Sequence, residues 1–366
     1  MQEHDALFAL ALKLTPRIGT ITAKKIIEEF GSAKNAWQTK KNEIAAFLQL
    51  PKILATAIGE ENILDQAKKE VDFLIKNDYK YLYYLNEDYP ALLKEADDCP
   101  TILFTKGNFE QAFKNTFLSI VGTRNCTQYG KDFLVQLIGE LKNQSITYVS
   151  GLAFGIDKIV HDEALKHNLP TIAIVGHGLQ TIYPSEHKLI ADKMILNGGL
   201  LTEYTSKEAM HPTNFISRNR IIAGLSKATL IIESDFKGGS LSTARFANDY
   251  NREVLALPGK VTDKYSTGCN NLIKNNKAML LSNVEDVLSA LDIITQKKPT
   301  IKKELFVDLK EPHKSVFELI GKEQKIHLDQ ISSTLSVPTY KLVSILLDLE
   351  LKDLVISLSG GYYQQK

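Results

Sequence analysis

Two arginines and an aromatic residue flank an asparagine in the segment HPTNFISRNRIIAGLS, residues 211–226. Pro212 and Thr213 favour a helix that begins just before these side chains. Cations at a helix N-terminus oppose the helix dipole, at a cost of roughly 0.3 to 1 kcal/mol per charge unless an anion lies nearby. A ligand anion such as a phosphate would offset that cost. The candidate binding residues in this segment are Phe215, Arg218, Asn219 and Arg220.

The two arginines of this segment point in different directions. Residues 218 and 220 lie about 200° apart around a helix of 3.6 residues per turn. We therefore expect them to have different partners. One of the two is expected to pair with an internal carboxylate such as Glu203 or Glu233.

Three further segments place glycines and polar residues directly after apolar runs. They are SIVGTRNCTQYG at 119–130, VSGLAFGIDKIVHDEAL at 149–165 and KGGSLSTARF at 237–246. A glycine turn leading into a helix presents backbone N–H groups to a phosphate, and a hydroxyl or a cation nearby adds to that binding. These segments add to the candidate site the residues Gly122, Thr123, Arg124, Gly151, Lys237, Gly239 and Ser240.

Several phosphate-binding positions in a row, with an aromatic ring among them, suit a polynucleotide backbone better than a single nucleotide. Phe215 would then be the platform on which a base stacks, a contact worth about 1 to 3 kcal/mol per base and tolerant of sequence. The net charge of the chain is only +1, so the case for a nucleic-acid partner rests on this local clustering.

Catalytic and metal-binding interpretations are less well supported by the sequence. Asp157 and His161 have the four-residue spacing of a metal pair or an acid–base pair, but no third ligand stands nearby, which favours a helix-stabilising contact between them. His177 lies between glycines without a nucleophile of the hydrolase type, which favours a structural or ligand-lining role. We therefore predict no catalytic residue, no metal and no organic cofactor.

The composition predicts a soluble globular protein of two or three domains. The chain has 366 residues, of which 44% are hydrophobic and 24% charged. Its three cysteines lie far apart without CxxC spacing, which argues against a disulfide framework and a zinc site. The N-terminal residues do not have the pattern of a signal peptide, and no apolar run reaches the roughly 18 residues that span a bilayer. We expect a cytoplasmic protein with no membrane partner.

Residues 1–75 contain apolar residues at three- and four-residue spacing, which predicts a small helical domain. Within it, LTPRIGTITAKKIIEEF is similar to a helix-hairpin-helix motif, whose glycine hairpin presents backbone N–H groups to DNA phosphate. Gly19 occupies the second glycine position of the hairpin, but Arg17 stands at the first. This departure favours a packing role for the module.

Residues 76–295 contain short β-branched runs that alternate with helical stretches. The runs are FLSIVG, ITYVSG, TIAIVG, LLTEY, ATLIIES and EVLALPG. Repeated strand–helix units predict an α/β domain, with a parallel sheet covered by helices on both faces. Ligands of such sheets bind at the carboxyl ends of the strands.

Residues 296–312 are polar and rich in lysine, as expected of a linker. Residues 313–366 then show a helix-turn-helix pattern with Pro338 near the start of its second helix, followed by a Gly-Gly hairpin, which predicts a winged helix. That second helix offers Lys341 and Lys352 as its basic residues, beside several acidic ones. A protein-contact role is at least as well supported as DNA binding.

Seven blocks in order resemble one family, the DNA-processing protein A family (DprA, also called Smf). They are YPALLKEADDCPTILFTKGN, SIVGTRNCTQYG, VSGLAFGIDKIVHDEAL, GHGLQTIYPSEH, FISRNRIIAGLS, KGGSLSTARFANDYNREVLALPG and GCNNLIKNNKAML. The resemblance implies a Rossmann-like core between an N-terminal helical domain, similar to a SAM or helix-hairpin-helix domain, and a C-terminal winged helix. It also implies a non-enzymatic protein that binds single-stranded DNA and loads the RecA recombinase onto it in natural transformation, as a homodimer formed through the Rossmann-like domain.

Carried over by motif, the family's DNA-contacting residues correspond here to Arg124, Phe215, Arg218, Arg220 and Lys237. One departure concerns the second glycine motif, where many relatives have an arginine and this chain has Phe154. The change removes one phosphate contact or adds an aromatic surface, and the sequence does not decide between the two.

Two other functions remain compatible with the sequence. A Rossmann-like nucleotide hydrolase would need a carboxylate at the sugar, and Glu233 or Asp157 could supply it. A ligand-sensing regulator would bind duplex DNA through the winged helix and an effector through the central domain.

Overall fold

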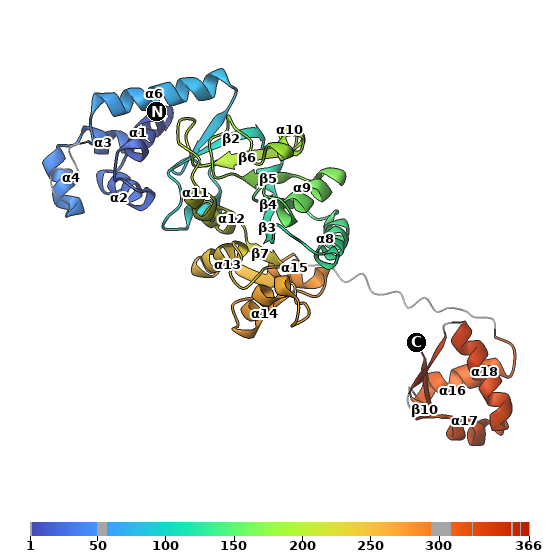
Figure 1. Ribbon diagram of the computed structural model, residues 1–366. Helices are drawn as coiled ribbons and strands as arrows, with labels where there is room; N and C mark the ends of the chain where they lie inside the picture. Colours follow the sequence, from blue (N-terminus) through green and yellow to red (C-terminus); the bar gives the residue numbers. More distant parts are fainter. Residues whose placement is uncertain are drawn as a thin grey trace. The chain divides into compact units, whose positions relative to one another are not determined.

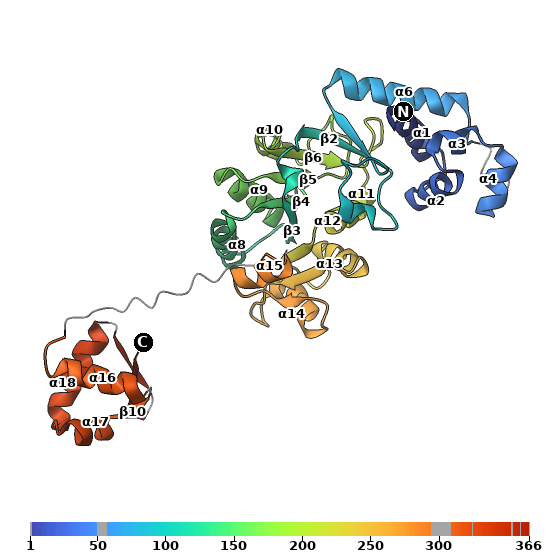
Figure 2. The same cartoon turned by 180° about the vertical axis from the view of Figure 1, so that it is seen from behind.

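The computed structural model describes residues 2–49, 57–293, 309–323, 325–352, 354–358 and 360–365. The chain forms two compact units, Met1–Thr295 and Gln296–Lys366 (Figures 1 and 2). Residues 296–308 of the expected linker lie outside the described residues. Among the residues that the structure describes, no helix combines the length and the apolar character needed to cross a bilayer.

The first unit begins with the expected helical module. Its helices are α1 (Gln2–Leu14), α2 (Thr20–Phe30), α3 (Ala33–Gln38), α4 (Lys41–Leu48) and α6 (Glu61–Lys76). The shortest of them, α3, has six residues, and the Ser32 hydroxyl caps it by accepting from the Asn35 N–H at 3.0 Å. The module and the sheet share one apolar core, so the domain boundary at residue 75 stays a prediction.

The hairpin between α1 and α2 forms although its first glycine is missing. Arg17 adopts the left-handed conformation, with φ of 68°, that glycine would adopt without strain. Gly19 caps the start of α2 with an extended backbone. The hairpin therefore keeps its shape with Arg17 in place of the first glycine. We predict a packing role for the module because that glycine is missing.

A nine-stranded sheet forms the centre of the first unit. The strands are β1 (Lys80–Tyr83), β2 (Ile102–Asn108), β3 (Thr116–Gly122), β4 (Ile146–Ser150), β5 (Thr171–Ile174), β6 (Gly198–Thr202), β7 (Ala228–Ile232), β8 (Glu253–Ala256) and β9 (Met279–Leu280). Their order is β1-β2-β6-β5-β4-β3-β7-β8-β9. The strands from β6 to β9 in this order run parallel, whereas β1 and β2 add an antiparallel edge. The predicted α/β class with a parallel Rossmann-like core is confirmed.

The direction of winding reverses at β3. After β3 the chain adds β4, β5 and β6 on one side and then returns to place β7 on the other. Because β3 and β7 are neighbouring strands, the loops that follow them start side by side and then run apart from each other. In open parallel sheets such a point leaves a crevice at the carboxyl edge, which is where ligands bind.

Helices cover both faces of the sheet, and side chains alternate between two buried clusters. On β3, Phe117 and Val121 face one cluster while Leu118 and Ile120 face the other. The second cluster includes residues of α8 (Gln128–Leu141), α9 (Ile156–Lys166) and α15 (Val284–Ala290). The first includes residues of α7 (Ala91–Lys94), α10 (Lys188–Met194), α12 (Asn219–Leu225), α13 (Ser240–Asp249) and α14 (Thr267–Lys274).

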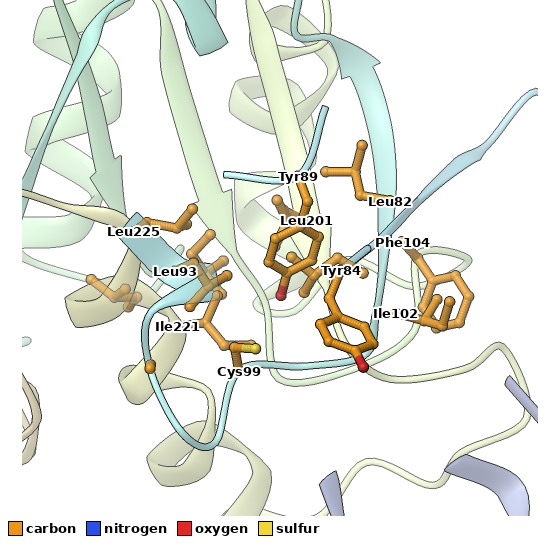
Figure 3. Close-up of a cluster of buried hydrophobic side chains, with 14 of the residues drawn as sticks. Leu82, Tyr84, Tyr89, Leu93, Cys99, Ile102, Phe104, Leu201, Ile221 and Leu225 are labelled. Atoms are coloured by element: carbon orange, nitrogen blue, oxygen red, sulfur yellow. The ribbon is translucent and has the colours of Figure 1, made fainter. Parts of the chain in front are cut away.

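Beneath α12 lies a dense part of the first cluster (Figure 3). It joins the antiparallel edge to the parallel core through the side chains of Leu82, Tyr84, Tyr89, Leu93, Cys99, Ile102, Phe104, Leu201, Ile221 and Leu225. Leu93 packs so closely beneath α12 that a Cβ on Gly224 would lie 2.7 Å from its Cδ1. This packing sets the position of α12, which begins directly after Arg218.

The second unit is the predicted winged helix. It consists of α16 (His313–Glu323), β10 (Ile326–His327), α17 (Leu328–Leu335), α18 (Thr339–Leu351), β11 (Val355–Leu358) and β12 (Tyr362–Gln365). The strands pair in the order β10-β12-β11, and Gly360 and Gly361 adopt positive φ in the turn between β11 and β12. A separate apolar core with Val316, Ile331 and Leu346 holds the three helices together.

Removal of the Leu93 side chain tests the support beneath α12. We expect Leu93→Ala to lower the free energy of unfolding by about 2 to 5 kcal/mol, since the residue is fully buried and leaves a cavity. The measurement is urea unfolding followed by the fluorescence of Trp37, the chain's single tryptophan, which lies in the same core. Leu189→Ala, at a leucine that is 75% exposed, is the matched control and should change the value by less than about 0.5 kcal/mol.

Candidate functional site

A pocket of about 330 Å³ opens at the carboxyl ends of β3 and β7, where the winding of the sheet reverses. We call it the polar pocket. Eight of the eleven predicted site residues line it, namely Gly122, Thr123, Arg124, Phe215, Arg218, Asn219, Gly239 and Ser240. The other three are outside the lining of this pocket. They are Gly151, Arg220 and Lys237, which are described below.

Gly122 ends β3 where no side chain would fit. A Cβ there would lie 1.9 Å from the carbonyl oxygen of Ile232 and 2.6 Å from Cγ1 of Ile156. The next residue, Thr123, donates its N–H to the carbonyl oxygen of Glu233 at 2.9 Å. The glycine is therefore required because the chain packs closely against β7 and α9. The sequence had suggested a different reason, a turn.

Arg124 is exposed at the mouth of the polar pocket. Its guanidinium has no hydrogen-bond or ion-pair partner among the described residues. A cation held beside a helix start, without an internal counter-ion, attracts an external anion. Arg124 is therefore free to contact a ligand in the polar pocket.

Arg218 is buried, with 7% of its surface exposed, at the junction of α11 (Pro212–Ser217) and α12. Its Nη1 donates to the carbonyl oxygen of Ile174, its Nε donates to Oδ1 of Asn219 at 3.1 Å, and its Nη2 lies 4.0 Å from Oδ2 of Asp157. Burial lowers the pKa of Arg218, and the Asp157 carboxylate opposes that shift. Burial likewise raises the pKa of Asp157 against the influence of Arg218.

Gly151 makes room for this buried pair. A Cβ at position 151 would lie 2.2 Å from both Nη2 of Arg218 and Oδ2 of Asp157. The Asp157 carboxylate also accepts from the N–H of Ala153 at 3.2 Å and so orders the loop after β4. Gly151 was predicted to bind phosphate; the structure places it behind Arg218.

Asn219 connects α12 to the start of α13. Its side-chain Nδ2 donates to Oγ of Ser242 at 2.9 Å, and Ser240 Oγ donates to Ser234 Oγ at 2.9 Å. The space beside Gly239 is open, since no atom lies within 4 Å of the position of a Cβ there. The N-terminus of the ten-residue helix α13 thus faces the polar pocket, with its dipole favouring an anion.

Arg220 points away from the polar pocket. Its Nη2 donates to Oε2 of Glu203 at 2.6 Å, and its Nε lies 3.9 Å from Oδ2 of Asp98. Burial works against the charge, but the two carboxylates outweigh it and raise the pKa of Arg220. The expectation that one of the two arginines pairs with an internal carboxylate such as Glu203 is confirmed for Arg220, and Arg218 lies near a different carboxylate, that of Asp157.

Lys237 is exposed on the turn between β7 and α13, outside the lining of the polar pocket. Among the described residues it has no ion-pair partner. It lies at the same edge of the sheet as Arg124, because the loops after β3 and β7 follow adjacent strands.

The expected contact between Asp157 and His161 was wrong. The Asp157 carboxylate turns back to the loop after β4, whereas His161 Nδ1 pairs with Oγ1 of Thr171 at 2.8 Å. Burial lowers the pKa of His161 to about 3, so the ring is neutral in the core. His177 is buried beside a second pocket, with Nδ1 3.0 Å from the carbonyl oxygen of Gly178, which agrees with a ligand-lining position.

Glu233 follows β7 with a left-handed backbone, φ 55°, which costs conformational energy for a residue with a side chain. Its carboxylate accepts from the backbone N–H of Thr127 at 2.7 Å and from Oγ1 of the same residue at 2.5 Å. Glu233 therefore holds the start of α8, and both of its oxygens are engaged.

A smaller pocket of about 60 Å³ adjoins the polar pocket, and the sequence did not predict it. We call it the aromatic pocket, because Phe154, Tyr183 and Phe215 line it together with His177. These residues come from the loops after β4 and β5 and from α11. The two pockets share Arg124 and Arg218 at their boundary. In the sequence, only the unusual Phe154 pointed to this feature.

Comparison with known protein families gives two matches. Residues 80–292 match the family described as DNA recombination-mediator protein A, and residues 307–361 match the DprA winged helix domain. Together they cover the central sheet and most of the C-terminal unit.

Individual relatives extend this similarity. The chain is 33% identical over 291 residues to Protein Smf of Synechocystis, which covers 77% of this chain and 72% of that protein. It is 36% identical over 252 residues to the DNA processing protein DprA of Bacillus subtilis, which covers 69% of this chain and 79% of the relative.

Two solved structures share the fold. DNA processing protein A from Streptococcus pneumoniae has a TM-score of 0.63 at 30% identity, covering 76% of this chain and 95% of that one. DNA processing protein A from Helicobacter pylori, whose structure addresses its single-stranded DNA binding mode, has a TM-score of 0.52 at 29% identity, covering 58% and 95%. With the family matches over both units, these likenesses show that the chain belongs to the DNA recombination-mediator protein A family.

Proposed function

We propose that this protein binds single-stranded DNA across the carboxyl edge of its central sheet and loads the RecA recombinase onto that strand. The observation that carries the proposal is the position of Arg124, an exposed cation without an internal partner, between a helix N-terminus and an aromatic pocket. The single-stranded DNA binding mode described for the Helicobacter pylori relative supports it.

The four predicted cations divide into two kinds. Arg124 and Lys237 are exposed and free to contact phosphate, and the N-terminus of α13 adds backbone donors at the polar pocket. Arg218 is buried, the side chain of Arg220 is 11% exposed, and both are paired with carboxylates. We assign phosphate contact to the exposed pair, a bracing role to Arg218 beneath the pocket, and a purely structural role to Arg220.

The aromatic side of the site favours a single strand. Phe215 is half-buried and lines both pockets, so part of its ring is accessible from the site. Stacking on such a ring requires an unpaired base and tolerates any sequence.

We infer that the protein is not an enzyme. A nucleotide hydrolase would need a free carboxylate beside the sugar. Glu233 uses both oxygens to hold the start of α8, and Asp157 accepts backbone N–H groups behind Arg218. Both carboxylates thus serve the fold.

The homodimer, the RecA partner and the cytoplasmic location are further parts of the proposal. Dimerisation through the Rossmann-like domain is supported by β9, a two-residue edge strand whose Met279 and Leu280 are about half exposed. Exposed apolar side chains of this kind favour contact with another protein surface. RecA loading rests on membership of the recombination-mediator family.

The winged helix has the surface of a protein-contact module. The outward face of α18, the second helix of the helix-turn-helix, displays the exposed side chains of Tyr340, Val343 and Leu347. Lys341 on α18 and Lys352 directly after the helix are exposed basic residues. A helix that reads duplex DNA needs polar or basic side chains on this face to contact base edges and phosphates.

Reversal of the two exposed cations tests the proposed DNA site. We expect Arg124→Glu with Lys237→Glu to weaken single-strand binding roughly tenfold or more, and to reduce the slope of log affinity against log salt by about 1.4, because two phosphate contacts are lost. Fluorescence anisotropy of a labelled single strand at several salt concentrations measures both quantities. The control, Lys142→Glu with Lys193→Glu, makes the same charge change at exposed lysines near the helix ends, away from the site. Equal binding by the two double variants would contradict the assignment.

A stability measurement separates Arg220 from Arg124. Arg220→Met leaves the buried Glu203 carboxylate without its partner and should lower the free energy of unfolding by about 3 to 5 kcal/mol. Arg124→Met, at an exposed residue without a partner, should change it by less than about 0.5 kcal/mol. Urea unfolding followed by Trp37 fluorescence gives both values. If both variants were equally stable, the structural role of Arg220 would be wrong.

Truncation tests the role of the winged helix. A chain ending at residue 295 keeps the whole first unit and both pockets, so we expect its single-strand affinity to equal that of the full chain. The same titration with duplex competitor compares the two proteins. If the truncation abolished a tight, sequence-specific binding of duplex, the protein would instead be a DNA regulator.

A further inference from the structure

We infer that Glu70, on α6 of the helical module, is a positioning residue for the proposed DNA site. It holds the loop between β6 and α11, residues 203–211, and through this β6–α11 loop it sets the position of α11, which bears Phe215. This role rests on the proposed function, because it takes α11 to contact DNA at the polar pocket. It gives the helical module a part in the site beyond packing.

Glu70 is a buried carboxylate whose partner belongs to the β6–α11 loop. It is 5% exposed. Its Oε1 accepts from the backbone N–H of Ser206 at 2.7 Å, and its Oε2 accepts from the hydroxyl of the same residue at 2.5 Å. Among the described residues it has no ion-pair partner. A buried charge without a counter-ion depends on its hydrogen bonds, so both bonds to Ser206 are needed to keep the carboxylate there.

The place of Glu70 on α6 shows that packing alone does not explain it. The four buried residues of this helix recur at spacings of four, three and four, and so form one face; they are Ile63, Ala67, Glu70 and Leu74. Three of them are apolar, and an apolar residue at position 70 would serve the burial of the helix better than a carboxylate. A carboxylate on the buried face of an amphipathic helix indicates a specific partner, which here is Ser206.

Ser206 lies between the helical module and the loop after β5. Its carbonyl oxygen accepts from Nε2 of Gln180. A Cβ on Gly178 would lie 2.6 Å from the carbonyl oxygen of Thr205 and 3.1 Å from Cα of Ser206, so the two loops touch. The β6–α11 loop is therefore held on two sides, by Glu70 from α6 and by the loop after β5.

The helix α11 has no buried residue and therefore no core of its own. Instead it is attached to the β6–α11 loop by hydrogen bonds. Oη of Tyr204 donates to the carbonyl oxygen of Asn214 at 3.2 Å, and Nδ2 of Asn214 donates to the carbonyl oxygen of Ala209 at 3.4 Å. The other end of α11 leads directly into α12 at Arg218. The start of α11 consequently follows the loop, and Phe215 at the polar pocket follows with it.

Phe215 also approaches the end of β5. A Cβ on Gly176 would lie 3.2 Å from both Cα and Cδ1 of Phe215. A van der Waals contact of this kind limits how close α11 comes to the sheet but has little directional preference. The orientation of α11 over the polar pocket therefore depends on the hydrogen-bonded loop, and this loop depends on Glu70.

Hydrogen exchange followed by mass spectrometry tests the hold on α11 without DNA. Glu70→Leu keeps the buried face of α6 apolar and removes both acceptors of Ser206. The amides of residues 203–217 should then exchange faster by on the order of tenfold, which corresponds to the loss of a hydrogen bond to a charged group, while those of α12 stay unchanged. Glu70→Gln should retain slow exchange, since its amide accepts from the N–H and donates to the hydroxyl. Glu61→Leu makes the same change at an exposed glutamate of α6 and should have no effect on residues 203–217.

Fluorescence anisotropy with a labelled oligothymidine tests the consequence for DNA. We expect Glu70→Leu to weaken binding roughly fivefold or more, the lower end of the value of one stacked base. The salt slope should stay unchanged, because Arg124 and Lys237 do not lie on α11. In a Phe215→Ala background the same change should weaken binding by less than about twofold, because the contact that Glu70 positions is already absent.

Ser206→Ala serves if Glu70→Leu folds poorly. It removes one of the two hydrogen bonds from a loop rather than from the buried face of a helix, so it should raise exchange and weaken binding in the same direction, by a smaller factor.

Unchanged exchange or unchanged affinity in Glu70→Leu would overturn the positioning role, and so would equal behaviour of the leucine and glutamine variants. An equal loss of affinity with and without Phe215 would show that the effect does not pass through α11, and the role would again be wrong. In these cases binding by the wild type leaves the proposed function standing. If the wild type binds no single strand, the proposed function fails, and the exchange data still decide whether Glu70 holds α11.

Discussion

The buried guanidinium of Arg218 connects the parts of the molecule that form the site. It reaches the end of β5 through the carbonyl of Ile174, the start of α9 through Asp157, and the start of α13 through Asn219. Burying a charge is costly unless it is paired and hydrogen-bonded, and here the contacts meet both conditions. Because these loops share one charged side chain, the geometry of the polar pocket depends on this pairing.

That arrangement explains how a nearly neutral protein presents a cationic site. The net charge is +1, but only some of the cations in the site are paired with carboxylates. Arg218 and Arg220 are balanced by carboxylates in the interior, whereas Arg124 and Lys237 face solvent without partners among the described residues. A local field at one sheet edge attracts an anion irrespective of the charge on the rest of the molecule.

The topology of the sheet brings two different environments together at this edge. The reversal at β3 opens the polar pocket towards β7, and the loops after β4 and β5 form the aromatic pocket beside it. The strain in this region is local, with Glu233 directly after β7 and Leu152 two residues after the end of β4, both at positive φ. Backbone strain at strand ends is typical of functional sites, and the surrounding packing supports it here.

The sequence by itself determined the long helices of the module, strands β3 to β8, the winged helix and most lining residues of the polar pocket. These depend on apolar periodicity and on glycine turns, which are local signals. It did not predict β1 and β2, which form an antiparallel edge through pairing with β6.

Only the tertiary structure decided that Arg220 rather than Arg218 meets Glu203, that Gly151 makes room for Arg218, and that Phe154 and Tyr183 share a pocket. Each of these outcomes depends on which strands are neighbours, and contacts between distant segments leave no periodic signal in the chain.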